Sequence, residues 1–110
     1  MLKEEFMQLA EEVAELVDKK HHDYNSVVRL DQYFPFGDKS YVHMLMTKVL
    51  RMVNLAHQNE RATFESMDDS LDDLIAYAIF HRAYRKRLHD ERRAAALIGK
   101  TTGGSYHART

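Results

Sequence analysis

The 110-residue chain contains no cysteine, which excludes disulfide bonds and thiolate chemistry and suits a reducing cytosol. No apolar run approaches the ~18 residues that a membrane span requires, and the Met1 end lacks the apolar core of a signal peptide. The net charge of −1 gives no global reason to expect binding to nucleic acid or to a membrane. These absences predict a soluble, cytoplasmic protein in which any basic site is local.

The composition, 45% apolar and 30% charged, is that of one ordinary globular domain. Apolar residues recur at helical spacing, which predicts an all-α fold built as an antiparallel bundle of three main helices. The three helices are expected at residues 2–22, 39–58 and about 66–98. We therefore expect a single helical domain over residues 1–98, with Gly99 ending the third helix, and a flexible C-terminal tail over residues 99–110.

Residues 23–38 break the helical period, because Pro35 and Gly37 forbid a continuous helix there. This segment is expected to be a loop that is pinned down by its aromatic side chains, which are Tyr33, Phe34 and Phe36.

The second helix carries an unusually wide apolar face between Tyr41 and Ala56, so we expect it to be largely buried. Three helices need not cover such a face. The pattern therefore favours a homo-oligomer, either a dimer or a larger assembly.

Three carboxylates recur every fourth residue where the third helix begins, at Glu65, Asp69 and Asp73. A step of four residues turns about 40° around a helix axis, so the three side chains share one face. The same face continues through Ala76 and Phe80, which places the acids on a stripe that should look toward the core. Because carboxylates are rarely buried without a partner, the pattern predicts pairing with cations or binding of a metal ion.

Three cations also lie on apolar faces: Lys48 and Arg51 on the second helix, and Lys20 on the first. Each can bury its stem and keep its charged end in water. Opposite a row of acids, however, the three cations can neutralise the carboxylates or share with them a ligand that carries both negative charge and a metal. A metal-bound nucleotide phosphate is such a ligand.

These residues carry a family resemblance in three runs: Lys19-Lys20-His21-His22-Asp23-Tyr24-Asn25, Lys48-x-x-Arg51 and Glu65-Ser66-x-x-Asp69-x-x-x-Asp73-Leu74-x-x-Tyr77-Ala78. In this order, over roughly residues 15–80, the chain resembles the MazG-like, nucleotide-modification-associated family of phages and bacteria, regarded as relatives of all-α nucleoside triphosphate pyrophosphohydrolases. The resemblance implies a mostly helical, often oligomeric protein. It also implies that carboxylates bind magnesium and that a nucleoside triphosphate is cleaved to a monophosphate and pyrophosphate.

If the site is catalytic, magnesium would bridge phosphate oxygens and be held by Glu65, Asp69 and Asp73. The charge on the transferred and leaving phosphates would be neutralised by Lys20, Lys48 and Arg51. The expected catalytic residues are then Asp69, Asp73 and Lys48.

Other roles in the site stay open. A carboxylate that does not bind metal, either Asp69 or Asp72, would act as the base. Either Tyr24 or Tyr77 would stack on the nucleobase or hydrogen-bond to the sugar, although a buried tyrosine also fits the core.

The acids of the third helix have structural explanations as well. Ser66 followed by Asp69 resembles a capping box, and Asp69 and Asp73 could form salt bridges with Lys48 and Arg51. The second helix has no acid between Lys39 and Asn59, whereas the better-known pyrophosphohydrolases bring acids from two helices to the metal. A literal acidic match in the first helix, Glu11-Glu12-x-x-Glu15, reads instead as a solvated face.

Two other functions remain open. One is a non-catalytic nucleotide-binding or sequestering phage protein, which the lack of acids on the second helix favours. The other is a helical interaction module that docks nucleic acid or protein through its basic segment between Arg82 and Arg93, although the acids within that segment favour a solvated helix end.

Overall fold

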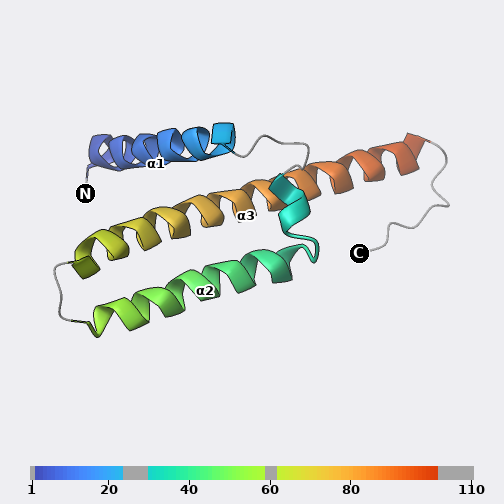
Figure 1. Cartoon of the computed structure of the whole chain (residues 1–110). Helices are drawn as coiled ribbons and strands as arrows, with labels where there is room; N and C mark the ends of the chain where they lie inside the picture. The colour runs from blue at the N-terminus through green and yellow to red at the C-terminus, as the bar shows by residue number, and fades with distance from the viewer. Residues whose placement is uncertain (1, 24–29, 59–61, 102–110) are drawn as a thin grey trace. The chain divides into compact units, whose positions relative to one another are not determined.

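The computed structural model describes residues 2–23, 30–58 and 62–101, and over these residues it contains helices and no strand (Figure 1). The elements in chain order are α1 (Lys3–Asp23), the short 3-10 helix η1 (Leu30–Tyr33), α2 (Asp38–Ala56) and α3 (Ala62–Thr101). The predicted all-α fold with three main helices is confirmed. Within the described ranges, none of the helices combines the length and the apolarity of a membrane span.

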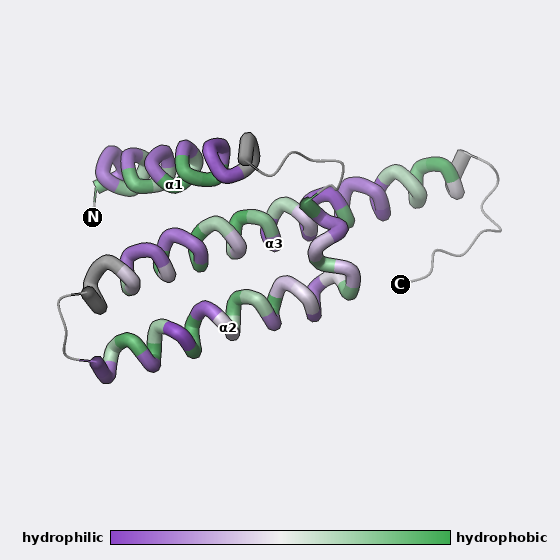
Figure 2. The backbone as a smooth tube through the Cα atoms, in the orientation of Figure 1, coloured by the Kyte–Doolittle hydropathy of each residue, from purple (hydrophilic) through white to green (hydrophobic). Residues whose placement is uncertain are grey.

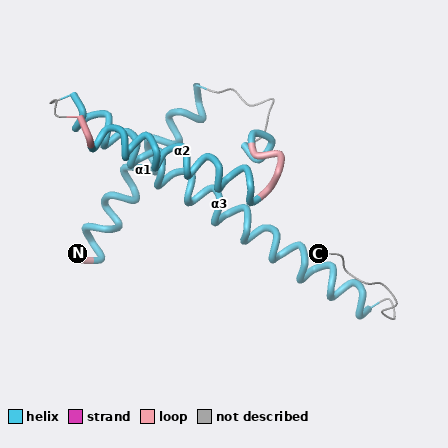
Figure 3. Tube along the Cα trace, turned by 90° about the horizontal axis from the view of Figure 1, so that it is seen from below, coloured by secondary structure: helices cyan, strands magenta, loops and turns pink. Residues whose placement is uncertain are grey.

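The chain divides into two compact units, Met1–Ile79 and Phe80–Thr110. In the first unit, α2 and the N-terminal part of α3 run side by side in opposite directions, and α1 crosses them obliquely (Figure 3). The second unit contains the remainder of α3, whose basic side chains between Arg82 and Arg93 are exposed, as expected of a solvated helix end.

The predicted ends of α1 and α2 are close to the observed ones, but α3 is longer than expected. It begins at Ala62, ahead of the predicted Ser66, and continues through Gly99 to Thr101. Gly99 therefore does not end the helix. Most of the predicted tail, residues 102–110, lies outside the described residues.

The turn before α2 depends on a glycine. Gly37 has φ 60° and ψ −133°, a backbone conformation that residues with a Cβ rarely adopt. Its carbonyl oxygen accepts the N–H groups of Ser40 (3.0 Å) and Tyr41 (3.3 Å), while the Ser40 hydroxyl oxygen accepts the Phe36 N–H (2.9 Å). The break that Pro35 and Gly37 predicted is thus a tightly bonded turn that leads directly into α2.

Aromatic side chains join this turn to both helices. The buried rings of Phe34 and Tyr41 stack with their centroids 4.1 Å apart, and Tyr77 of α3 meets Phe34 edge-on at 6.0 Å. Phe34 therefore pins the loop, as predicted. Tyr33 and Phe36 do not, because 64% and 77% of their surfaces are exposed.

The buried core of the described residues is small. Its apolar members are Val13, Phe34, Tyr41 and Leu55. The expectation that α2 is largely buried is wrong for a single chain. An apolar stripe on α2 is 44–58% exposed, and its members are Val42, Met46, Val49, Leu50 and Val53. Figure 2 shows apolar residues recurring along the whole of α2, whereas α1 is polar along one side and apolar along the other.

Replacing Gly37 with alanine is expected to lower the free energy of unfolding by about 1–3 kcal/mol, because the added Cβ makes the left-handed backbone conformation costly. Urea denaturation followed by circular dichroism measures the change. Gly99→Ala is the matched control: a Cβ there meets nothing within 4 Å, so no loss of stability is expected. Equal stability of Gly37→Ala and the unsubstituted protein would contradict the role given to this turn.

Candidate functional site

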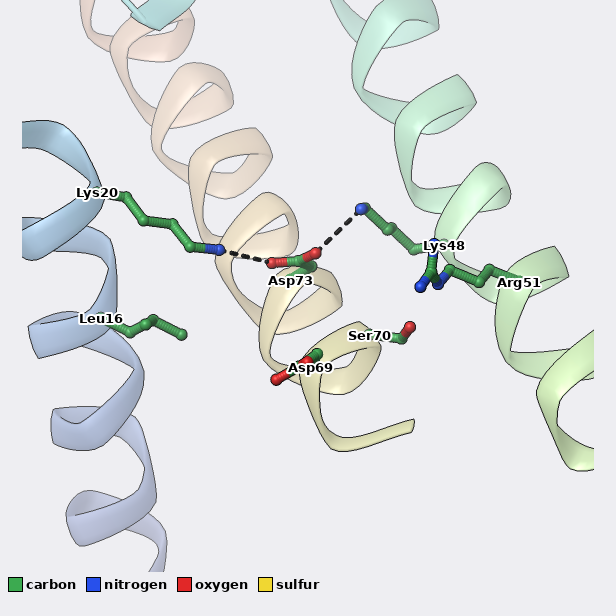
Figure 4. A pocket seen from close by; sticks show the side chains of 7 residues that line it. All are labelled: Leu16, Lys20, Lys48, Arg51, Asp69, Ser70 and Asp73. Atoms are coloured by element: carbon green, nitrogen blue, oxygen red, sulfur yellow. Dashed lines mark hydrogen bonds and ion pairs between the residues drawn. The ribbon is translucent and has the colours of Figure 1, made fainter. Parts of the chain in front are cut away.

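Side chains from α1, α2 and α3 surround one pocket of about 400 Å³ within the first unit (Figure 4). Five predicted site residues line it: Lys20, Lys48, Arg51, Asp69 and Asp73. In Figure 4, α3 lies between α1 and α2, so its carboxylates can meet cations from both neighbours. The predicted convergence of acids from one helix with cations from two others is therefore present.

Asp73 forms the centre of the pocket. Its Oδ1 accepts a hydrogen bond from the Lys20 ammonium at 3.2 Å, and its Oδ2 accepts one from the Lys48 ammonium at 3.0 Å. Lys48 is the more buried of the two lysines, with 21% of its side chain exposed against 53% for Lys20. The predicted salt bridge between Asp73 and Lys48 is confirmed, and the second cation on this carboxylate is Lys20 of α1.

The two lysines also set the protonation of Asp73. Burial on its own would raise the pKa of this carboxyl, but the hydrogen bonds and charges of Lys48 and Lys20 outweigh it and hold the pKa below its ordinary value. Asp73 therefore remains ionised at neutral pH and keeps both ammonium groups in place.

The ring of Tyr77 lies beneath Lys48, whose Nζ is 5.7 Å from the ring centroid. This distance is that of a cation–π contact, which attracts the ammonium group to the ring face. Tyr77 also packs against Phe34, so it belongs to the aromatic core and supports Lys48 from below.

The other two charged residues that line the pocket, Asp69 and Arg51, differ from Asp73 in their ion pairs. Among the described residues, neither Asp69 nor Arg51 forms an ion pair, although both line the pocket. Among the described residues that line the pocket, three cations face two carboxylates, a surplus of one positive charge. A pocket of this charge is suited to an anionic ligand, and guanidinium and ammonium groups are the usual partners of phosphate.

A model of the family described as nucleotide modification associated domain 1 matches residues 20–82, more than half of the chain. The chain belongs to this family. Neither the comparison with curated proteins nor the comparison with solved structures finds a significant match. The residues matched to the nucleotide modification associated domain include every charged residue of the pocket.

Among the remaining candidate residues with described side chains, Tyr77 does not line the pocket. Tyr24 lies outside the described residues, and Glu65 lies in α3 but its side chain is not described. Asp72, one of the two candidate bases, does not line the pocket, whereas Asp69 does.

The fit of a magnesium ion to these residues is uneven. No group of three or more histidine or acidic side chains that could hold a metal ion occurs among the residues with described side chains. Asp69 offers carboxylate oxygens of the kind that magnesium takes. Asp73 does not fit as a metal ligand while both of its oxygens are bound by lysines.

Sequence reasoning missed two residues of the pocket, Leu16 and Ser70. Ser70 is 2% exposed and is the buried polar residue of the described core. A signal was available, because Ser70 precedes Asp73 by three residues and Tyr77 by seven, which places it on the inner face of α3.

The sequence also offered two structural explanations for acidic residues, a capping box at Ser66 and a solvated face on α1, and only the second agrees with the structure. Ser66 lies inside α3, four residues after its first residue, so the capping-box explanation for Asp69 is wrong. Glu11, Glu12 and Glu15 are all exposed on α1, in agreement with a solvated face.

Asp73→Asn is expected to destabilise the protein at pH 7 by about 1 kcal/mol, a figure already reduced for the partial exposure of the ion pairs. Because the folded pKa of Asp73 is lowered, its stabilising effect is full above the unfolded pKa of about 3.9 and is lost as the pH falls through the folded value. The difference in unfolding free energy between the protein and this variant should therefore shrink below about pH 4.

Urea denaturation of both proteins between pH 7 and pH 2.5 measures this difference. Asp69→Asn is the matched control, since Asp69 makes no ion pair with another described residue and should show little of the effect. A difference for Asp73→Asn that stays constant down to pH 2.5 would contradict the assignment.

Proposed function

We propose that the pocket between α1, α2 and α3 binds the phosphate groups of a nucleotide. The observation that carries the proposal is the placement of Lys20, Lys48 and Arg51 around one cavity with a surplus of positive charge. The family description, which concerns nucleotide modification, supports a nucleotide as the ligand.

Asp73 acts in this proposal as the residue that positions the cations. Two ammonium groups close together repel each other, and a carboxylate shared between them removes that cost before any ligand arrives. The Tyr77 ring contacts Lys48 from a second direction. Lysines positioned in this way lose less side-chain entropy when a phosphate binds.

The reaction that we propose is MazG-like hydrolysis of a nucleoside triphosphate, with either a canonical or a modified base, to the monophosphate and pyrophosphate. Asp69 and Lys48 would be its catalytic residues, and Asp73 would act through the lysines that it positions. Magnesium would bind through Asp69, and its bound form would supply charge neutralisation on the phosphates and a more acidic water. Lys20, Lys48 and Arg51 would stabilise the negative charge of the leaving pyrophosphate.

One observation favours a second candidate, a protein that binds a nucleotide without cleaving it. Both oxygens of Asp73 are held by lysines, so this carboxylate serves the cations and is not offered to a metal. In such a binder, the positive pocket alone would sequester the ligand.

Replacing Lys48 with methionine is expected to weaken nucleoside triphosphate binding about tenfold or more, since it removes the most buried ammonium from the pocket. Isothermal titration calorimetry in EDTA measures the affinity without magnesium-dependent cleavage. Lys19→Met is the matched control, because Lys19 is exposed on α1 and does not line the pocket. Equal losses for both variants would assign the effect to overall charge and contradict the pocket.

Incubation with magnesium and a panel of canonical and modified nucleoside triphosphates, followed by detection of pyrophosphate, separates the two candidates. On the hydrolase proposal, pyrophosphate is released and Asp69→Asn lowers the rate about a hundredfold or more. Binding of a nucleotide without any pyrophosphate would establish the sequestering protein instead.

We also propose that two copies of the chain associate through the exposed apolar stripe of α2. The stripe repeats at helical spacing from Val42 to Val53, and a monomer would leave it in water at a cost that burial against a second copy removes. This arrangement would supply the partner that the wide apolar face requires.

Leu50→Glu is expected to convert the dimer to a monomer, because it places a charge in the centre of the stripe. Sedimentation equilibrium over a range of protein concentrations measures the change. Thr47→Glu is the matched control, since Thr47 is exposed on α2 outside the stripe. Monomeric behaviour of the unsubstituted protein at all concentrations would contradict the proposed interface.

A further inference from the structure

A second cavity, of about 320 Å³, lies beside the glycine turn within the first unit. Its walls include the exposed rings of Tyr33 and Phe36 and the buried ring of Phe34. Two large exposed aromatic side chains three residues apart are costly in water and are common where a flat ring is to be bound. Lys39, Ser40 and His43 add polar groups at the same cavity.

The backbone fixes this cavity firmly. The Phe34 N–H donates to the Asp31 carbonyl oxygen at 3.1 Å, and the Phe36 N–H donates to the Ser40 hydroxyl oxygen at 2.9 Å. Together with the conformation of Gly37, these bonds hold the aromatic residues against the first turn of α2. The exposed rings are therefore mounted on an ordered turn.

The aromatic cavity and the phosphate pocket lie along one face of α2. Ser40 and Met44 line the first, and Lys48 and Arg51 line the second. Successive steps of four, four and three residues keep these four positions on one side of the helix. From Ser40 to Lys48 the helix rises about 12 Å, at ~1.5 Å per residue, which is comparable with the length of a nucleoside triphosphate.

Contacting aromatic rings lie between the two cavities. Phe34 lines the aromatic cavity and meets Tyr77 edge-on at 6.0 Å, and the Lys48 ammonium of the phosphate pocket is 5.7 Å from the Tyr77 ring centroid. The two cavities are therefore neighbours, with the Lys48 ammonium at one and the exposed Phe36 ring at the other.

We infer that the cavity of Tyr33 and Phe36 is the nucleobase subsite of the ligand whose phosphates occupy the Lys20, Lys48 and Arg51 pocket. This inference rests on the proposed nucleotide-binding function and adds the place and the chemistry of base recognition. The base stacks on the exposed aromatic rings, and Lys39 and His43 hydrogen-bond to its edge.

The test compares ligands with and without a base. The affinities of the four canonical deoxynucleoside triphosphates and of inorganic tripolyphosphate are measured by calorimetry in EDTA. The preferred deoxynucleoside triphosphate is expected to bind about tenfold or more tightly than tripolyphosphate, the gain typical of one stacked base. Phe36→Ala and Tyr33→Ala should each reduce this advantage and leave tripolyphosphate binding unchanged.

Phe6→Ala is the matched control, because it makes the same change at an exposed phenylalanine of α1 that does not line the cavity. Circular dichroism and sedimentation check that the variants keep their fold and assembly. Nuclear magnetic resonance adds a direct measurement, in which the Tyr33 and Phe36 ring signals shift with the deoxynucleoside triphosphate and not with tripolyphosphate.

Three results would overturn the inference, and they differ in what else they overturn. Equal affinity for tripolyphosphate and for all four deoxynucleoside triphosphates would leave the phosphate pocket standing and remove the base subsite. A change of assembly in Phe36→Ala without any change in ligand affinity would assign the cavity to an interface between copies. Failure of every one of these ligands to bind would remove the proposed function together with its subsite.

Discussion

The carboxylate of Asp73, shared between two ammonium groups, is the interaction on which the rest of this site depends. It joins three helices through two hydrogen bonds, at 3.2 Å to α1 and 3.0 Å to α2. Without this carboxylate, Lys20 and Lys48 would face each other uncompensated, and the pocket would open or lose one of its cations. Its desolvation is offset by the two lysines, so the group stays charged where burial alone would favour neutrality.

This arrangement is better explained by the positioning of charge than by stability. The side chains of Asp73 and Lys20 are 27% and 53% exposed, and ion pairs of that exposure add little to the free energy of folding. The aromatic core formed by Phe34, Tyr41 and Tyr77 supplies the packing nearby, which leaves Asp73 available to organise the cations.

Much of the fold and of the site could be predicted from the sequence because both follow helical spacing. The four-residue repeat of Asp69 and Asp73, and the position of Lys48 on an apolar face, were sufficient to predict that these residues meet. Periodicity gives the face of a helix but not its ends. The start of α3 was therefore misplaced, and the apparent cap at Ser66 proved to be a position inside the helix.

The rest of the site depends on tertiary contacts that no local pattern encodes. Lys20 could be placed on the apolar face of its helix but not paired with Asp73. The sequence of neither helix alone predicts how α1 crosses α3. Ser70 was missed because its signal lay only in its helical spacing from Asp73 and Tyr77, since a serine is marked by neither charge nor hydropathy. The aromatic residues of the loop were recognised, but only the observed turn at Gly37 separates the buried Phe34 from the exposed Phe36.

The lysines of the pocket are already occupied by a resident anion, and this has a consequence for selectivity. An incoming anion must compete with a carboxylate that is tethered to the same helix and so has a high effective concentration. On the proposed function, a monovalent solute such as chloride or acetate would compete poorly with it. Ligands with several linked negative groups would gain at each cation in turn, so Asp73 would set a minimum valence for admission to the pocket.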